Sequence, residues 1–283
     1  MRILIIMVFI HVFLSANSAA SELDWEVSGF DMPESVVYDP IGKQLIVSNI
    51  DGHPMATNRQ GYLSRVSLDG KIIEQKWITG MNAPKGMAIV GNTLFIADLK
   101  EIHRVDLEKQ TLEESILIED SIFLNDITSD SAGNVYISDF MDHKIYRLHN
   151  GKTTIWLEDE LISHPNGLLV DEGTLYVGNW GVGMREDFTT DTLGSLIAVN
   201  LSNQQVTPVL HGEALGNLDG IIRIGNDLLV NDWINGKLFT LNPKGKKMIA
   251  QFPAGLADIG QHNNVIYLPL MLDDKLQAMR LTQ

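Results

Sequence analysis

The most constraining feature of this 283-residue chain is a short pattern that occurs six times along it. In each copy a Pro, Leu or Ala precedes a polar or charged residue, and a small or apolar run follows. The six polar positions are 51, 40, 41, 53 and 39 residues apart, and a period of about 40 to 50 residues is typical of four-stranded propeller blades. We call these positions the anchor residues: Glu34, Lys85, Asn125, Asn166, Asp219 and Asp258.

Each anchor residue is followed by a strand pattern, a polar turn and a second run rich in β-branched and aromatic residues. Residues 45–47, 94–96 and 135–137 are examples of the second run, and Ser131-Ala132-Gly133 is one of the turns. Such runs bounded by turn residues are typical of antiparallel strands, and no stretch has a sustained helical period. The sequence therefore predicts an all-β fold, a six-bladed β-propeller with four-stranded blades.

The sixth blade lacks an outer strand at the C-terminus, because only two residues follow residues 278–281. Residues 24–28, Asp-Trp-Glu-Val-Ser, have the alternation of a strand. We expect this N-terminal strand to supply the missing one, which would close the ring and remove two exposed strand edges.

The first 20 residues are expected to be a signal peptide. Arg2 precedes an apolar run over residues 3–14, and Ser18-Ala19-Ala20 offers a cleavage site before Ser21. The alternative is a single membrane anchor, but the run is shorter than the roughly 20 apolar residues that span a bilayer. The predicted organisation is a signal peptide over residues 1–20 and one propeller domain over residues 21–283, in a periplasmic or secreted protein.

Charge and cysteine content exclude several classes of partner and site. The formal charge is −15, and loss of residues 1–20 leaves 20 basic and 36 acidic residues, a charge of −16. Such a surface repels nucleic-acid phosphates and anionic lipid, so we expect neither a nucleic-acid partner nor membrane binding after signal cleavage. The chain has no Cys, which excludes disulfides and thiolate metal sites. Cations are the natural partners.

The anchor residues would form a ring around the axis if each one starts the inner strand of a blade. Five of the six side chains end in oxygen, the donor that hard cations such as calcium prefer. Without a cation, Glu34, Asp219 and Asp258 would repel one another and their pKa values would rise.

Simpler interpretations of the anchor residues are open. Asn166-Gly167 and Asp219-Gly220 match hairpin turns, and Glu34 alone could be a solvated carboxylate. Lys85 could form a structural ion pair with Glu34 or Asp258, which we favour, or it could meet an anionic substrate.

Apolar residues are expected around the ring. Two long loops, residues 49–61 and 180–194, would lie beside the anchor residues, and long loops in compact domains are usually functional or mobile. The predicted substrate pocket consists of Lys85, Phe123, Phe140, Trp180, Trp233 and Asp258. The chain has no G-x-S-x-G elbow, no Gly-rich phosphate loop and no zinc-type His spacing, so serine-hydrolase and nucleotide chemistry are not supported.

Four anchor residues also lie in family motifs. Glu34 lies in Pro-Glu-Ser, Asn125 in Asn-Asp, Asn166 in Pro-Asn-Gly and Asp219 in Leu-Asp-Gly. On these motifs the chain after residue 20 resembles the senescence marker protein, gluconolactonase and luciferin-regenerating family of six-bladed propellers, which is related to paraoxonases. The resemblance implies that Glu34, Asn125, Asn166 and Asp219 hold a divalent metal, calcium first, with magnesium, manganese and zinc as alternatives. It also implies a hydrolase-like domain with Asp219 as the catalytic residue.

The chain departs from the family pattern at the substrate side. Family members often have an Arg two residues before the Asn-Asp asparagine, where this chain has Phe123. Ser35 replaces a Gly and Leu218 replaces a Pro. We therefore expect an alkyl or aryl lactone to be preferred over a sugar lactone.

The leading interpretation is a secreted, metal-dependent hydrolase of a small-molecule lactone or related ester, with the metal as Lewis acid. The alternative is a non-catalytic propeller that binds a ligand or protein and keeps a structural metal, since one fold hosts many functions. A third interpretation, condensation of the strictosidine-synthase type, needs an acidic residue but no metal, and the four oxygen ligands argue against it. The sequence identifies no protein partner.

Overall fold

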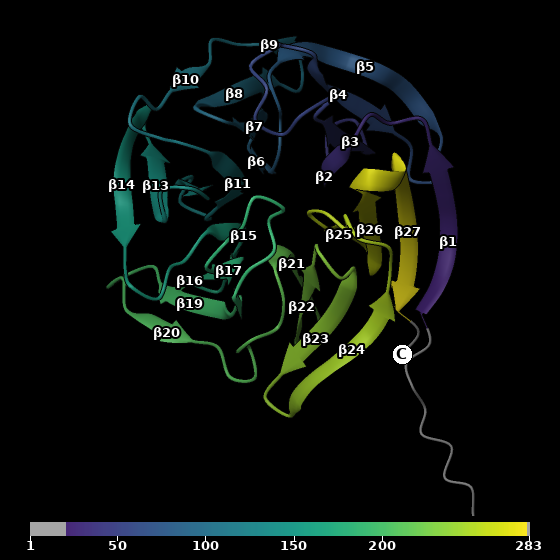
Figure 1. Cartoon of the computed structure of the whole chain (residues 1–283). Helices are drawn as coiled ribbons and strands as arrows, with labels where there is room; N and C mark the ends of the chain where they lie inside the picture. The colour runs from purple at the N-terminus through teal and green to yellow at the C-terminus, as the bar shows by residue number, and fades with distance from the viewer. Residues whose placement is uncertain (1–20, 282–283) are drawn as a thin grey trace, which may run out of the picture.

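The computed structural model describes residues 21–281, and the expected signal peptide, residues 1–20, lies outside the described residues. Six antiparallel sheets surround one axis (Figure 1), so the predicted six-bladed β-propeller is confirmed. Within residues 21–281 the helical structure amounts to one 3-10 turn, η1 (Met271–Asp273). None of the described helical structure is long or apolar enough to cross a membrane.

The sheets follow one another in chain order, and each runs from an inner strand at the axis to an outer strand. Blade 1 consists of β2 (Pro33–Asp39), β3 (Gln44–Asn49), β4 (Gly61–Val66) and β5 (Ile72–Met81). Blade 2 consists of β6 (Met87–Val90), β7 (Thr93–Asp98) and β8 (Glu101–Asp106), with β9 (Thr111–Leu112) and β10 (Ile116–Leu117) both paired with β8. Blade 3 consists of β11 (Leu124–Ser129), β12 (Val135–Asp139), β13 (Lys144–His149) and β14 (Lys152–Glu158).

Blades 4 to 6 have the same plan. Blade 4 consists of β15 (Pro165–Asp171), β16 (Thr174–Asn179), β19 (Leu196–Asn200) and β20 (Val206–Pro208). Blade 5 consists of β21 (Leu218–Ile224), β22 (Asp227–Asp232), β23 (Lys237–Asn242) and β24 (Gly245–Gln251). Blade 6 consists of β25 (Gly260–His262), β26 (Val265–Leu270), β27 (Lys275–Leu281) and β1 (Ser21–Ser28). A two-stranded hairpin, β17 (Gly181–Val182) and β18 (Thr192–Leu193), rises from the long loop of blade 4.

The outer strand of blade 6 comes from the N-terminal end of the described chain. β1 pairs antiparallel with β27 from Ser21 opposite Leu281 to Ser28 opposite Lys275, and the two strands lie side by side in Figure 1. Trp25 of β1 packs 5.9 Å from the Tyr267 ring and donates its indole N–H to the Leu68 carbonyl of blade 1. β1 therefore contacts blades 6 and 1. Its contribution to the stability of the ring stays a prediction.

Apolar side chains fill each of the six gaps between neighbouring blades. Side chains alternate across a strand, so Leu45 and Val47 face blade 6 while Ile46 between them faces blade 2. Because both faces of each sheet are buried, the second strands have continuous apolar sequences instead of an alternating pattern. Packing between blades supplies the core and leaves the axis for polar residues.

A second repeat, which sequence analysis missed, fixes the loops next to the axis. Five blades end their second strand with Asp or Asn: Asn49, Asp98, Asp139, Asn179 and Asp232. Each side chain accepts a backbone N–H from the loop that leads into the inner strand of its blade. Side-chain acceptors of this kind satisfy loop backbone groups that have no ladder partner. They hold the inner-strand starts in place.

Glycine lets the inner strands approach closely at the axis. A Cβ on Gly167 of blade 4 would lie 1.5 Å from the Asp219 carbonyl oxygen of blade 5, and one on Gly220 would lie 2.3 Å from the Ile259 nitrogen of blade 6. Neither position tolerates a side chain. The Gly after each of these anchor residues is thus a packing requirement of the ring.

Replacement of Trp25 by Ala is expected to lower the free energy of unfolding by about 2 kcal/mol, because it removes a half-buried aromatic ring and its hydrogen bond. Denaturant unfolding of the mature chain measures this change. Leu23→Ala on the same strand is the control, since Leu23 is 56% exposed, and it should change stability by less than about 0.5 kcal/mol. Equal midpoints for the two variants would mean that β1 contributes little to the ring.

Candidate functional site

One pocket of about 90 Å³ at the axis brings together five of the six anchor side chains. Its polar lining consists of Glu34, Lys85, Asn125, Asn166 and Asp219. Its apolar lining consists of Ile50, Pro54, Phe123, Phe140, Trp180, Phe188, Trp233 and Met271. All of the predicted pocket and metal residues except Asp258 are therefore in one place.

Four of these side chains each have a buried oxygen without a hydrogen-bond partner among residues 21–281. The atoms are Glu34 Oε2, Asn125 Oδ1, Asn166 Oδ1 and Asp219 Oδ1. Their residues are only 3 to 6% exposed, and each is the second residue of its inner strand, β2, β11, β15 or β21. An unsatisfied buried polar group costs about 1 to 3 kcal/mol, so four of them in one pocket indicate a site built for a ligand.

Their burial within inner strands also excludes the simpler interpretations. Asn166-Gly167 and Asp219-Gly220 lie inside β15 and β21 and are not hairpin turns. Glu34 is buried and not a solvated carboxylate.

The two carboxylates of this set are electrostatically unfavourable as they stand. Burial raises the pKa of Glu34 well above its usual value, and the charges of Asp219 and Asp258 raise it further. Burial also raises the pKa of Asp219, with the Asp258 charge as a second cause. The direction is the one expected for clustered carboxyl groups without a cation. A bound cation would favour the ionised form of both.

Asp258 lies outside the pocket, because the sixth copy of the repeat is offset by one residue. Asp258 forms a parallel bridge with Ser35, and its backbone N–H donates to the Glu34 carbonyl. Its carboxylate accepts the Ser35 hydroxyl at 2.5 Å and lines a second axial cavity of about 200 Å³ that also contains Asp126. Burial raises the pKa of Asp258 to about 7. The small residue Ala257 takes its place in the cluster around the pocket.

Lys85 has no ion pair of the kind favoured from the sequence. Within residues 21–281, no carboxylate oxygen lies within 4.0 Å of its ammonium group. The Nζ instead donates to the Ala83 carbonyl at 2.8 Å and the Pro54 carbonyl at 3.1 Å, and it lies 4.5 Å from the centre of the Phe123 ring. Burial lowers the pKa of Lys85 to about 8, although the Glu34 charge opposes the shift.

Aromatic rings in contact form the wall of the pocket. Phe123 and Phe140 lie 5.7 Å apart, Phe140 and Trp180 5.5 Å, and Trp180 and Trp233 5.9 Å between ring centres. The Trp180 indole N–H donates to the Phe188 carbonyl at 2.8 Å, which holds the long loop of blade 4 against the pocket. Pro54 brings the long loop of blade 1 to the same place.

Sequence analysis did not name Ile50, Pro54 and Met271 as pocket residues. A signal for two of them is present, because Ile50 and Met271 each directly follow the second strand of their blade. Phe140, Trp180 and Trp233 have the same position in blades 3, 4 and 5. Pro54 has no such register, since it lies within an irregular loop.

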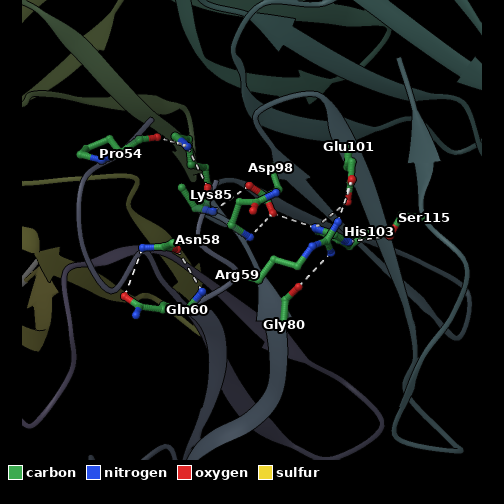
Figure 2. A network of polar contacts seen from close by, with 12 residues as sticks. Pro54, Asn58, Arg59, Gln60, Gly80, Lys85, Asp98, Glu101, His103 and Ser115 are labelled. Carbon is green, nitrogen blue, oxygen red and sulfur yellow. Dashed lines mark hydrogen bonds and ion pairs between the residues drawn. The ribbon is translucent and has the colours of Figure 1, made fainter. Parts of the chain in front are cut away.

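A buried polar network supports the Lys85 side of the pocket (Figure 2). Asp98 accepts the backbone N–H groups of Asn82 and Ala83, and it bonds His103 Nε2 at 2.8 Å, while His103 Nδ1 lies 2.6 Å from Ser115 Oγ. This Asp, His and Ser arrangement resembles a hydrolytic triad. None of the three lines the pocket, and His103 is 1% exposed, so its visible role is structural.

The donor set fits a hard divalent cation. Two carboxylates and two amide oxygens match the oxygen coordination of calcium, whereas zinc sites usually use nitrogen and sulfur ligands. In residues 21–281 no three His, Cys, Asp or Glu side chains gather as a metal cluster, so the amide oxygens are an essential part of the set. The larger hollow, about 560 Å³ between blades 5 and 6, has none of these four residues.

No protein-family model and no curated protein sequence matches this chain. Among solved structures, it is similar to a protein provisionally named gluconolactonase, with 17% identity, a TM-score of 0.67, and coverage of 93% of this chain and 92% of that one. It is also similar to virginiamycin B lyase from Staphylococcus aureus, with 15% identity, a TM-score of 0.64, and coverage of 92% and 99%. A streptogramin B lyase has 11% identity and a TM-score of 0.66 over 94% of this chain and 100% of that one.

These comparisons place the chain among the six-bladed β-propellers. The structures similar to it include a lyase and a protein named as a gluconolactonase. At identities of 11 to 17%, the likeness is one of fold.

Calcium is expected to stabilise the protein more at about pH 8 than at about pH 5. The carboxyl groups of Glu34 and Asp219, whose pKa values are raised by burial, stabilise the metal-free fold while they are protonated, so in chelator the fold loses this stability as the pH rises above about 4, the usual pKa of a carboxyl group. Calcium needs the ionised groups and reverses the loss. Melting curves in calcium and in chelator should differ by about 5 °C at the higher pH.

Asp219→Asn should lose most of this calcium-dependent increment. A calcium increment that is equal at both pH values, or absent from the wild-type protein, would contradict the cation site.

Proposed function

We propose that this chain is an exported, divalent-metal-dependent hydrolase of lactones or related esters, of the gluconolactonase-like type. One observation carries the proposal: side chains from four blades converge in one pocket, and each has a buried oxygen that no group of the described part of the chain satisfies. The similarity in fold to a protein named gluconolactonase supports the reaction class.

Glu34, Asn125, Asn166 and Asp219 would hold the metal, and we propose calcium, with magnesium, manganese and zinc to be tested beside it. Bound there, a divalent ion acts as a Lewis acid on a carbonyl oxygen and makes a bound water more acidic. Because two of the four ligands are neutral amides, only two negative charges oppose the ion and it keeps its electrophilic character.

The residues of the chain supply the other parts of a hydrolysis. Asp219 would hold the metal through one carboxylate oxygen and would accept the proton of an attacking water through the other. The rings of Phe123, Phe140, Trp180 and Trp233 bind the apolar part of the substrate and exclude bulk water. Phe188 and Pro54, from the two long loops, cover it.

A non-catalytic propeller with a structural metal is the competing function, and turnover decides between the two. The purified protein, treated with chelator, is screened against lactones and aryl esters, with each metal added back in turn. The proposal expects activity that requires added metal. Tight metal binding without turnover of any of these substrates would favour the binding protein.

Asp219→Asn and Asn166→Ala are expected to lower metal-dependent kcat/KM by at least about 100-fold, because Asn166→Ala removes an oxygen donor, whereas Asp219→Asn removes a negative charge from the metal ligands and also the base. Glu34→Gln should mainly weaken metal affinity, by about 10- to 100-fold. Asp227→Asn makes the same isosteric change on β22 outside the pocket and should leave kcat/KM unchanged. Wild-type rates in Asp219→Asn with metal bound would exclude its catalytic role.

Recognition should be dominated by apolar contacts. A lactone with a four-carbon side chain is expected to exceed its unsubstituted parent by about two orders of magnitude in kcat/KM, at about 0.8 kcal/mol per buried methylene. Phe188→Ala should reduce this ratio several-fold, because Phe188 is a half-buried part of the pocket wall. Equal rates on gluconolactone and an alkyl lactone would contradict the expectation.

A further inference from the structure

We propose that Lys85 recognises an anionic group of the substrate, so that this pocket takes a lactone or ester that also carries a carboxylate. That the bound anion is part of a substrate rests on the proposed function. The binding of an anion by Lys85 can be measured without turnover.

Lys85 is a pocket-lining cation without an acidic partner. It is 2% exposed, and within residues 21–281 no carboxylate oxygen lies within 4.0 Å of its Nζ. An ammonium group has three N–H donors, and two of them go to the carbonyls of Ala83 and Pro54. The third has no hydrogen-bond acceptor among the described residues. Buried charges are normally paired, which makes an unpaired one in a pocket a candidate for binding a ligand.

The charge balance of the pocket favours an anion there. A divalent cation held by Glu34 and Asp219 would neutralise both carboxylates, which leaves Lys85 as a net positive charge among the described residues that line the pocket. The Asp98 charge acts on Lys85 from outside the pocket. Asp126 and Asp258 line the other axial cavity. Asp126 accepts two backbone N–H groups and Asp258 accepts the Ser35 hydroxyl, so neither serves as the partner of Lys85.

The ammonium group is held in place on several sides. Asp98 fixes the backbone of Asn82 and Ala83, and the Ala83 carbonyl accepts the Lys85 ammonium (Figure 2). His103 in turn holds Asp98. The Pro54 carbonyl and the Phe123 ring contact the ammonium from the loop and from the wall. A cation fixed in this way loses little entropy when it binds an anion. Asp98 and His103 are thus positioning residues for Lys85.

The surroundings of Lys85 specify the rest of the ligand. The Phe123 ring beside the ammonium and the neighbouring Phe140 ring form an apolar surface, where a charge-assisted hydrogen bond is stronger than in water. The ligand that satisfies both features has an aryl or alkyl body and a terminal carboxylate.

Two matched pairs of compounds test the inference on the calcium-loaded full-length mature protein. Binding is measured by calorimetry for hydrocinnamate and its neutral amide, hydrocinnamamide. Turnover is measured for monophenyl glutarate and the neutral ester phenyl hexanoate. The wild-type protein should favour the anionic member of each pair by about 10- to 100-fold.

Lys85→Met, which keeps the length of the side chain, should remove this preference, and Lys85→Arg should keep part of it. Lys76→Met is the matched control, because Lys76 also lies 4.5 Å from a ring centre, that of Tyr62, but is exposed and paired with Asp51. It should leave the preference unchanged. Melting curves establish that each variant is folded.

The outcomes separate this inference from the proposed function. Lys85-dependent carboxylate binding without hydrolysis of either ester would support the inference and contradict the hydrolase. Hydrolysis of both esters at equal rates in the wild-type protein would support the hydrolase and overturn the inference. A carboxylate preference that persists in Lys85→Met, as when the metal alone holds the carboxylate, would also overturn it.

Discussion

Six inner strands start so close to one axis that the atoms of neighbouring blades touch, and the remaining features of this molecule depend on that crowding. The backbone of Gly86 hydrogen-bonds that of Asn125 across two blades, as Asp258 does with Glu34. At Gly167 even a methyl group would collide with the next blade. Strand starts at such distances place their first polar side chains in one small space, so a pocket of converging oxygens is a consequence of how the ring packs.

The pocket is stabilised by contacts elsewhere in the fold. Four side chains have buried oxygens without a partner in the part of the chain that the structure describes, and burial and mutual repulsion raise the pKa values of the carboxyl groups among them, so the site opposes folding locally. Apolar clusters between all neighbouring blades and the Asp and Asn side chains that bind the loop backbones compensate. Local destabilisation that the surrounding structure tolerates is typical of functional sites. The same groups that oppose folding would bind a cation.

The pocket combines two kinds of recognition. Its anchor residues provide hard oxygen donors and one ammonium group, whereas the residues after the second strands provide aromatic rings. The anchor residues lie at the start of the first strand of a blade, and the aromatic residues follow the end of the second strand. Because these two strands are antiparallel, the start of the first lies beside the end of the second. An antiparallel pair therefore brings a polar and an apolar residue to the same place in each blade.

The sequence by itself determined the blade count, the strand pattern and the positions of Glu34, Asn125, Asn166 and Asp219, because a repeat in register must place equivalent residues at equivalent points of a ring. The tertiary structure decided what depends on offsets of one residue or on the direction of a side chain. Asp258 is level with Ser35 and so leaves the pocket, a shift that period counting cannot detect. Lys85 donates to two backbone carbonyls and not to a carboxylate. One of these carbonyls belongs to Pro54, which lies in an irregular loop, so the sequence repeat could not predict this contact. Contacts made by irregular loops depend on how the backbone packs in three dimensions, and no local sequence pattern specifies them.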